Sequence, residues 1–144
     1  MTVREYLESI RALDLSIETK IRQEERLRTR LTDTAAHIGG DVPRASSPSK
    51  DKIGIVMAEI IDLQNERNEE IDRFVDMKAA IKDAVKALPK EERIVIEGMY
   101  FSHMKAREIM SQLYCSRRTV YRIRDKAIAT LESNKKVCHL CQLI

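Results

Sequence analysis

The sequence lacks tryptophan and has few residues of the kinds that build sheets and tight turns. Its 144 residues include two Phe, four Tyr, four Gly, three Pro and three Cys. Because β-sheet proteins are enriched in aromatic residues and need frequent turns, this composition favours long helices. Charged residues make up 34% of the chain, which is expected of helices with wide solvent-exposed faces. The sequence therefore predicts an all-α fold.

Patterns that would indicate an enzyme or a membrane protein are also missing. The sequence shows no glycine-rich phosphate loop, no Ser/His/Asp or Cys/His arrangement in a sensible context, and no paired carboxylates. We therefore expect no enzymatic activity, no small-molecule substrate and no cofactor. With no signal peptide and no apolar run long enough to span a bilayer, we expect a cytoplasmic protein of a bacterial host cell, without a membrane partner.

The few cysteines give a weak metal pattern. Cys138 and Cys141 have CxxC spacing, but no second pair is present in the chain to complete four zinc ligands. We therefore expect no metal site within one chain, although two tails meeting in a dimer leave that possibility open. Cys115 is expected to be a small core residue.

Two long amphipathic segments occupy the first part of the chain. Apolar residues recur in steps of three and four over residues 2–38, and the next glycines and prolines gather in a predicted loop at 39–51. A seven-residue repeat follows, formed by Ile53, Ile60, Phe74, Ile81 and Leu88 with Val56, Leu63, Met77 and Ala84 between them. Each segment would be about 55 Å long as a helix. Residues 1–87 are therefore predicted to form a coiled-coil-like antiparallel helical hairpin.

Two charged residues interrupt the apolar stripes of this hairpin at similar depth. Glu24 falls near the middle of the first stripe and Arg67 near the middle of the second. We expect them to approach each other and to help fix the register.

A two-helix hairpin buries only one seam, which leaves other apolar residues in water. Leu15, Ile55, Ile61, Ile71 and Val75 lie off the main stripe, and exposed apolar residues of this kind favour association. We expect a homodimer or higher homo-oligomer, most simply with four helices. RNA polymerase or another protein is the alternative partner, and a passive stalk is the plainest reading.

The segment 88–132 has the pattern of a helix-turn-helix. A short helix ending near Leu113 is followed by a break at Tyr114 and Cys115, and Ser116 is a good N-cap for a second helix. That second helix carries an apolar stripe formed by Val120, Ile123, Ala127, Ile128 and Leu131.

Basic residues gather on the other face of this second helix. Residues 104–126 contain seven basic and two acidic residues, although the whole chain has a net charge of only +3. Such a patch suits the phosphates of double-stranded DNA, whereas an ordinary solvated helix face is the alternative. We expect base contacts from Arg117, Arg118, Tyr121 and Arg122. We expect backbone contacts from Lys105, Arg107, Ser116, Thr119, Arg124 and Lys126.

These residues carry a resemblance to a known family. Leu88-Pro89-x-x-x-Arg93, Glu108-Ile109-x-x-x-Leu113, Ser116-x-x-Thr119-Val120-Tyr121 and Lys126-Ala127-x-x-x-Leu131 resemble region 4 of sigma-70-type factors. With long helices ahead of this segment, the chain is more similar to phage-encoded late transcription regulators of the ArpU and RinA type. Departures from the sigma pattern are Lys105 at the usual cap, Met110 at a usually small residue, and Tyr114 at a usual glycine.

The resemblance implies sequence-specific promoter binding and activation of late phage genes. The alternative is an adaptor or sigma-like protein that docks on RNA polymerase, with DNA contact secondary. Residues 133–144 form a C-terminal tail that either packs on the body, mediates assembly or frays.

Overall fold

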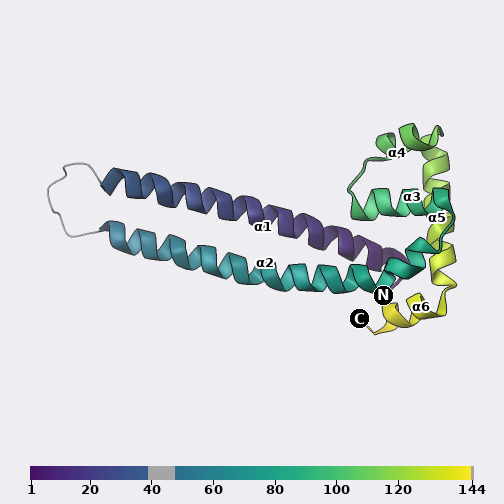
Figure 1. Ribbon diagram of the computed structural model, residues 1–144, viewed down its shortest axis with the longest axis horizontal. Coiled ribbons are helices and arrows are strands. Elements are labelled where there is room, and N and C mark those ends of the chain that lie inside the picture. Colours follow the sequence, from purple (N-terminus) through teal and green to yellow (C-terminus); the bar gives the residue numbers. More distant parts are fainter. Residues whose placement is uncertain (39–47, 144) are drawn as a thin grey trace. The chain divides into compact units, whose positions relative to one another are not determined.

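The computed structural model describes residues 1–38 and 48–143, and in this part of the chain all regular structure is helical. In chain order the elements are α1 (Val3–Ile38), α2 (Pro48–Lys86), α3 (Lys90–Ile96), a π-helical turn η1 (Glu97–Phe101), α4 (Ala106–Leu113), α5 (Arg117–Glu132) and α6 (Lys135–Gln142) (Figure 1). The predicted all-α fold is confirmed. None of the described helices is both long and apolar enough to cross a membrane.

Local chemistry explains where the two long helices begin and end. Thr2 and Glu5 form a reciprocal cap at the start of α1: the Thr2 hydroxyl accepts from the Glu5 N–H, and the Glu5 carboxylate accepts from the Thr2 N–H. Helix α2 begins at Pro48, a residue well suited to a first helical turn because it has no N–H to leave unpaired. It ends at Lys86, shortly before Pro89, which cannot continue a helix.

The start of α2 corrects the end of the predicted loop. Residues 48–51 of that loop are helical, with Asp51 placed favourably in the first turn. Residues 39–47 lie outside the described part of the chain.

The chain divides into two compact units, which do not follow the predicted boundary at residue 88. Unit 1 comprises residues 1–14 and 73–144, and unit 2 comprises residues 15–72. The reason is that Val3, Tyr6, Leu7 and Ile10, at the start of α1, belong to the same buried cluster as residues of α3, α4, α5 and α6.

Unit 1 has a continuous apolar core. The Tyr6 side chain is fully buried, and its hydroxyl donates to the Met77 carbonyl at 2.8 Å. Burial, together with the nearby Cys141, raises the pKa of Tyr6 to about 12. The C-terminal tail is part of this core, because Val137 and Cys141 of α6 are buried in it.

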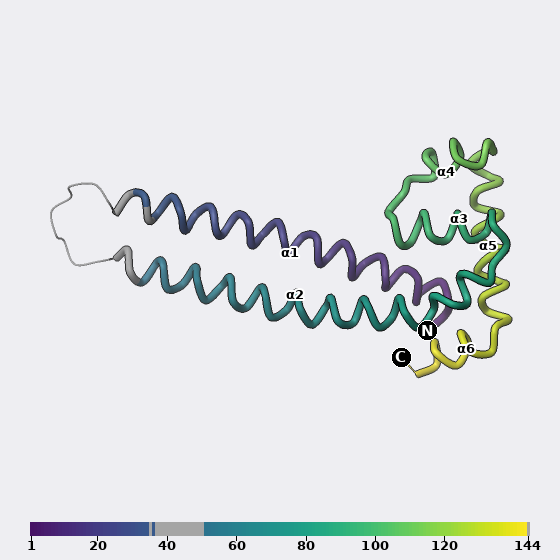
Figure 2. Tube along the Cα trace, viewed as in Figure 1, coloured from purple at the N-terminus to yellow at the C-terminus, as the bar shows by residue number. Residues whose placement is uncertain are grey.

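Unit 2 contains the remaining parts of α1 and α2, which run side by side and antiparallel (Figure 2). Ion pairs join Glu24 to Arg67 and Lys20 to Glu70 across the two helices. Of the apolar residues expected to stay in water, Leu15, Ile55 and Ile61 are exposed, as is Val75 of unit 1, whereas Ile71 is half-buried.

Candidate nucleic-acid interface

Helices α4 and α5 of unit 1 are joined by only three residues, Tyr114, Cys115 and Ser116. Tyr114 ends α4 in the left-handed conformation, with φ 51° and ψ 46°, and its N–H donates to the Met110 carbonyl. Ser116 caps α5, since its hydroxyl accepts from the Thr119 N–H at 3.3 Å. The turn is therefore as short as a three-residue connection allows, although Tyr114, and not a glycine, adopts its left-handed conformation.

The inner face of α5 is fixed by burial. Val120, Ala127, Ile128 and Leu131 are all buried in the core of unit 1. Because these residues share one side of the helix, the residues between them must face outward. The direction of the basic face therefore follows from packing.

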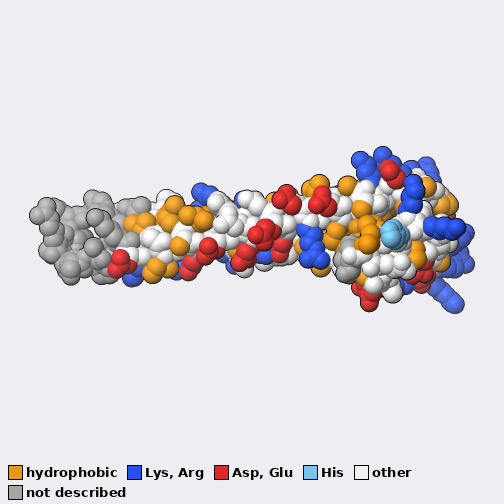
Figure 3. All heavy atoms as spheres, turned by 90° about the horizontal axis from the view of Figure 1, so that it is seen from below, with side chains coloured by type: hydrophobic (Ala, Val, Ile, Leu, Met, Phe, Trp, Pro, Cys, Tyr) orange, Lys and Arg blue, Asp and Glu red, His pale blue; other side chains and the backbone are white. Residues whose placement is uncertain are grey.

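The four residues predicted to contact bases all lie in the solvent-exposed part of α5. Arg117, Arg118 and Arg122 are exposed, and Tyr121 retains 38% of its accessible surface. Arg118, Tyr121 and Arg122 surround a shallow hollow together with Thr119 and Asp125. Figure 3 shows lysine and arginine side chains gathered on the surface of unit 1.

Asp125 is an acidic residue within this basic face. Its carboxylate accepts from the Arg124 guanidinium at 2.9 and 3.0 Å and from Arg4 of α1 at 3.0 Å. The hydrogen bonds from Arg124 contribute most to lowering the pKa of Asp125, and the Arg4 hydrogen bond adds to them. Arg124 also lies over the Tyr121 ring, 4.8 Å from its centroid. Arg124 thus orients Tyr121 and is less free to reach a phosphate than expected.

The other residues predicted to contact the DNA backbone have different surroundings. Lys105 and Arg107 at the start of α4 are exposed. The Lys105 N–H is capped by the Glu108 carboxylate at 2.7 Å, but the lysine side chain has no acceptor with which to complete the cap. Lys126 is exposed, with its Nζ 3.8 Å from the buried Glu92. The side-chain hydroxyls of Ser116 and Thr119 form a hydrogen bond with each other at 3.0 Å.

His103 holds the loop before α4 against α1. It adopts a positive φ of 52°, and its Nε2 lies 2.5 Å from the Asp14 carboxylate. This histidine is isolated in the sequence, because its partner lies 89 residues away. The sequence likewise gives no sign that Arg4 belongs to this site, because its partner Asp125 lies 121 residues away.

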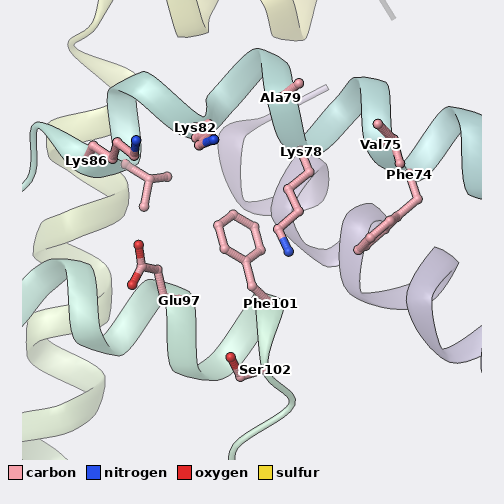
Figure 4. A pocket seen from close by; sticks show the side chains of 10 residues that line it. Phe74, Val75, Lys78, Ala79, Lys82, Lys86, Glu97, Phe101 and Ser102 are labelled. Atoms are coloured by element: carbon pink, nitrogen blue, oxygen red, sulfur yellow. The ribbon is translucent and has the colours of Figure 1, made fainter.

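A larger hollow in unit 1 lies between α2 and η1 (Figure 4). Its volume is about 550 Å³. The Lys78 ammonium points between the rings of Phe74 and Phe101, at 5.4 and 5.2 Å from their centroids. Lys82 and Lys86 continue along the same wall. The hollow combines apolar surface with the positive charge of these lysines, and Glu97 of η1 contributes one carboxylate to its lining.

In unit 2, the structure brings Glu24 and Arg67 together. Glu24 is buried and accepts hydrogen bonds from Arg28, Gln64 and Arg67. The bond from Gln64 makes the largest contribution to lowering the pKa of Glu24, followed by that from Arg28. The pair is therefore part of a small polar network.

The cysteines lie in three different environments. Cys115 is half-buried against the core, Cys138 is exposed and Cys141 is buried, which raises the pKa of its thiol. Among residues 1–38 and 48–143, no group of three or more His, Cys, Asp or Glu side chains is arranged to hold a metal ion.

Comparison with known proteins gives a family match. No curated protein and no solved structure matches the chain. The model of a family described as protein of unknown function (DUF722) matches residues 45–133, which cover all of α2, α3, η1, α4 and α5. Since this match spans more than half of the sequence, the chain belongs to the DUF722 family.

Proposed function

We propose that this protein is a sequence-specific DNA-binding transcription regulator that inserts the N-terminal half of α5 into the major groove. One observation carries the proposal: Arg117, Arg118 and Arg122 project from the exposed side of a capped helix whose opposite side is buried. In helix-turn-helix proteins the first turns of the second helix contact base edges. The positions of these arginines suit that docking.

The contacts of each basic residue within the protein suggest whether it reads a base, supports a neighbour or binds phosphate. Arg118 and Arg122 form no ion pair with any residue that the structure describes, so both are available for the acceptors of a guanine edge. Arg124 is held by Asp125 and supports Tyr121. Lys105 and Arg107 at the start of α4 are the phosphate contacts, since they are exposed beside the turn.

The biological role rests on the resemblance to phage late regulators. It extends the proposal to activation of late phage genes by a protein that acts in the bacterial cytoplasm. Neither part is needed for the DNA-binding proposal, which stands on α4 and α5 alone.

Selection of bound sequences from random double-stranded DNA tests this function directly. We expect enrichment of a defined site, and we expect enrichment to be lost in the Arg118→Ala/Arg122→Ala variant. A wild-type protein that enriches no sequence would contradict the proposal. The variant should keep the wild-type helical content, because both side chains are exposed.

A second candidate is an adaptor that docks on RNA polymerase, with DNA contact secondary. The observation that favours it is the hollow lined by Phe74, Phe101 and three lysines, which would suit an acidic protein segment with an apolar residue. Titration with DNA at two salt concentrations separates the candidates, because phosphate contacts give a steep dependence on salt. A flat response, with capture of polymerase that is lost in Lys78→Glu/Lys82→Glu, would favour the adaptor.

A further inference from the structure

Unit 2 contains a groove between α1 and α2 whose two walls carry opposite charges. Its volume is about 460 Å³. The α1 wall carries Arg26 and Arg30 beside Gln23, and the α2 wall carries Glu59, Asp62 and Glu66. The floor contains the half-buried side chains of Leu27 and Leu63.

The hairpin itself supplies an ionic partner to one of the charges that line the groove: Glu66 lies 3.8 Å from Lys20 of α1. Arg26, Arg30, Glu59 and Asp62 are all exposed, and none of them forms an ion pair with any residue in the described part of the chain. The floor leucines lie between them and remain partly accessible. A partner that fits this groove must therefore supply apolar side chains flanked by acidic groups on one side and basic groups on the other.

A second copy of the same hairpin supplies that pattern. The contacts of Glu24 with Arg67 and of Lys20 with Glu70 set the level of the two helices. In this register Arg30 lies level with the segment of α2 from Glu59 to Asp62. Arg26 lies about one helical turn before Arg30 on α1. A two-fold axis parallel to the helices keeps every residue at its own level and exchanges the α1 and α2 walls.

We propose that this groove is the docking surface for a second copy of the chain, which binds about a two-fold axis parallel to α1 and α2. Arg26 and Arg30 of each copy then face Glu59 and Asp62 of the other, so the ionic contacts form twice. Leu27 and Leu63 from both copies meet in one apolar layer at the same level. The result is a four-helix arrangement of two hairpins.

The charges also select among the possible pairings. A two-fold axis perpendicular to the helices would place the arginine walls of the two copies against each other and the acidic walls against each other. The like charges would then repel. This inference deepens the proposed function, because two copies would present two DNA-binding segments. It rests on unit 2 alone, and it is tested without DNA, so its failure and that of the proposed function are distinguishable.

Charge reversal with mixing tests the proposal. The Arg26→Glu/Arg30→Glu variant has two acidic walls, and the Glu59→Lys/Asp62→Lys variant has two basic walls. We expect wild type to sediment as a dimer and each variant alone to sediment as a monomer. An equimolar mixture of the two variants should regain the dimer, because both halves of the mixed interface then pair opposite charges.

Two controls keep the experiment interpretable. Circular dichroism should give wild-type helical content for both variants, and the mixture is informative even if one variant is less stable, since only a contact between chains can restore a mixed dimer. Glu69→Lys, an exposed change on α2 that does not line the groove, should remain dimeric. A monomeric wild type at micromolar concentration, dimers that persist in both variants, or a mixture that stays monomeric would overturn the proposal.

Discussion

Glu24 on α1 and Arg67 on α2 form an ion pair in which the Glu24 side chain is buried. Hydrogen bonds from Arg28 at 2.9 Å and Gln64 at 2.7 Å satisfy the same carboxylate. A buried charge is costly once its partners are removed, and an intact pair between the two helices is expected to favour one alignment of them. The pair is therefore expected to contribute to register as well as to stability.

Removal of one partner should destabilise the hairpin strongly. We expect Arg67→Ala to lower the free energy of unfolding by about 3 kcal/mol, because Glu24 loses its cross-helix cation while it stays buried. Urea denaturation of both single variants and of Glu24→Ala/Arg67→Ala gives the coupling energy. A coupling of about 1 kcal/mol or more is expected for residues in direct contact. Additive effects would contradict a shared role in register.

The pKa shifts in unit 2 predict a loss of stability in acid. The pKa values of Glu24 and Glu70 are lowered from the ordinary 4.5, that of Glu70 mainly by the hydrogen bond from Lys20. The unfolded chain then binds protons more readily than the folded chain. The stabilisation is complete above pH 4.5 and is lost as the pH falls through the lowered folded values. Urea midpoints measured from neutral pH into this range test it, and Glu24→Gln/Glu70→Gln should show a weaker acid dependence.

Tyr114 offers a site for stabilisation. Its left-handed backbone is unfavourable for a residue with a Cβ, and its side chain is 95% exposed, so little packing would be lost. We expect Tyr114→Gly to stabilise the protein by about 1 kcal/mol. Tyr114→Ala is the matched control, since alanine keeps the strain and should give no comparable gain. Thermal unfolding of the three proteins decides between these outcomes.

Gly98 of η1 allows α4 to approach closely. A Cβ at this position would lie 3.2 Å from Cδ1 of the fully buried Ile109 and 3.3 Å from the Met104 sulfur. We expect Gly98→Val to destabilise unit 1 by about 1–3 kcal/mol through overpacking. Gly54→Val is a control in α2, where an added Cβ meets no atom within 4 Å. Its unfolding free energy should stay within about 0.5 kcal/mol of wild type. Equal effects at the two sites would argue against close packing at Gly98.

Loss of a base contact and loss of a phosphate contact should have different effects on DNA binding. We expect Arg122→Ala to lose about 1–3 kcal/mol of discrimination at one base pair of the selected site. Arg107→Ala should instead weaken binding to all sequences and reduce the salt slope by about one. Fluorescence anisotropy with matched and mismatched duplexes at several salt concentrations measures both. Equal losses on specific and non-specific DNA for Arg122→Ala would remove it from base readout.

The sequence predicted the elements more reliably than their association. Apolar spacing in steps of three, four and seven gave the long helices, and the break before Ser116 gave the start of α5. The predicted loop extends too far, because proline is typical of loops and is equally favourable in a first helical turn, where Pro48 lies. The tail could not be assigned, because burial of Val137 and Cys141 depends on the surface that they meet.

By itself, the sequence determined the all-α class and the outward basic residues of the segment around α5, because helical periodicity and capping are local properties. Only the tertiary structure decided which of these residues form contacts with side chains from other parts of the chain. Arg4 donates to Asp125, 121 residues away, and this carboxylate also accepts from Arg124, while His103 reaches Asp14 across 89 residues. Contacts of such separation depend on how helices pack, and side-chain spacing along one helix does not encode them. The opposite walls of the unit 2 groove arise in the same way, from the register that α1 and α2 adopt on each other.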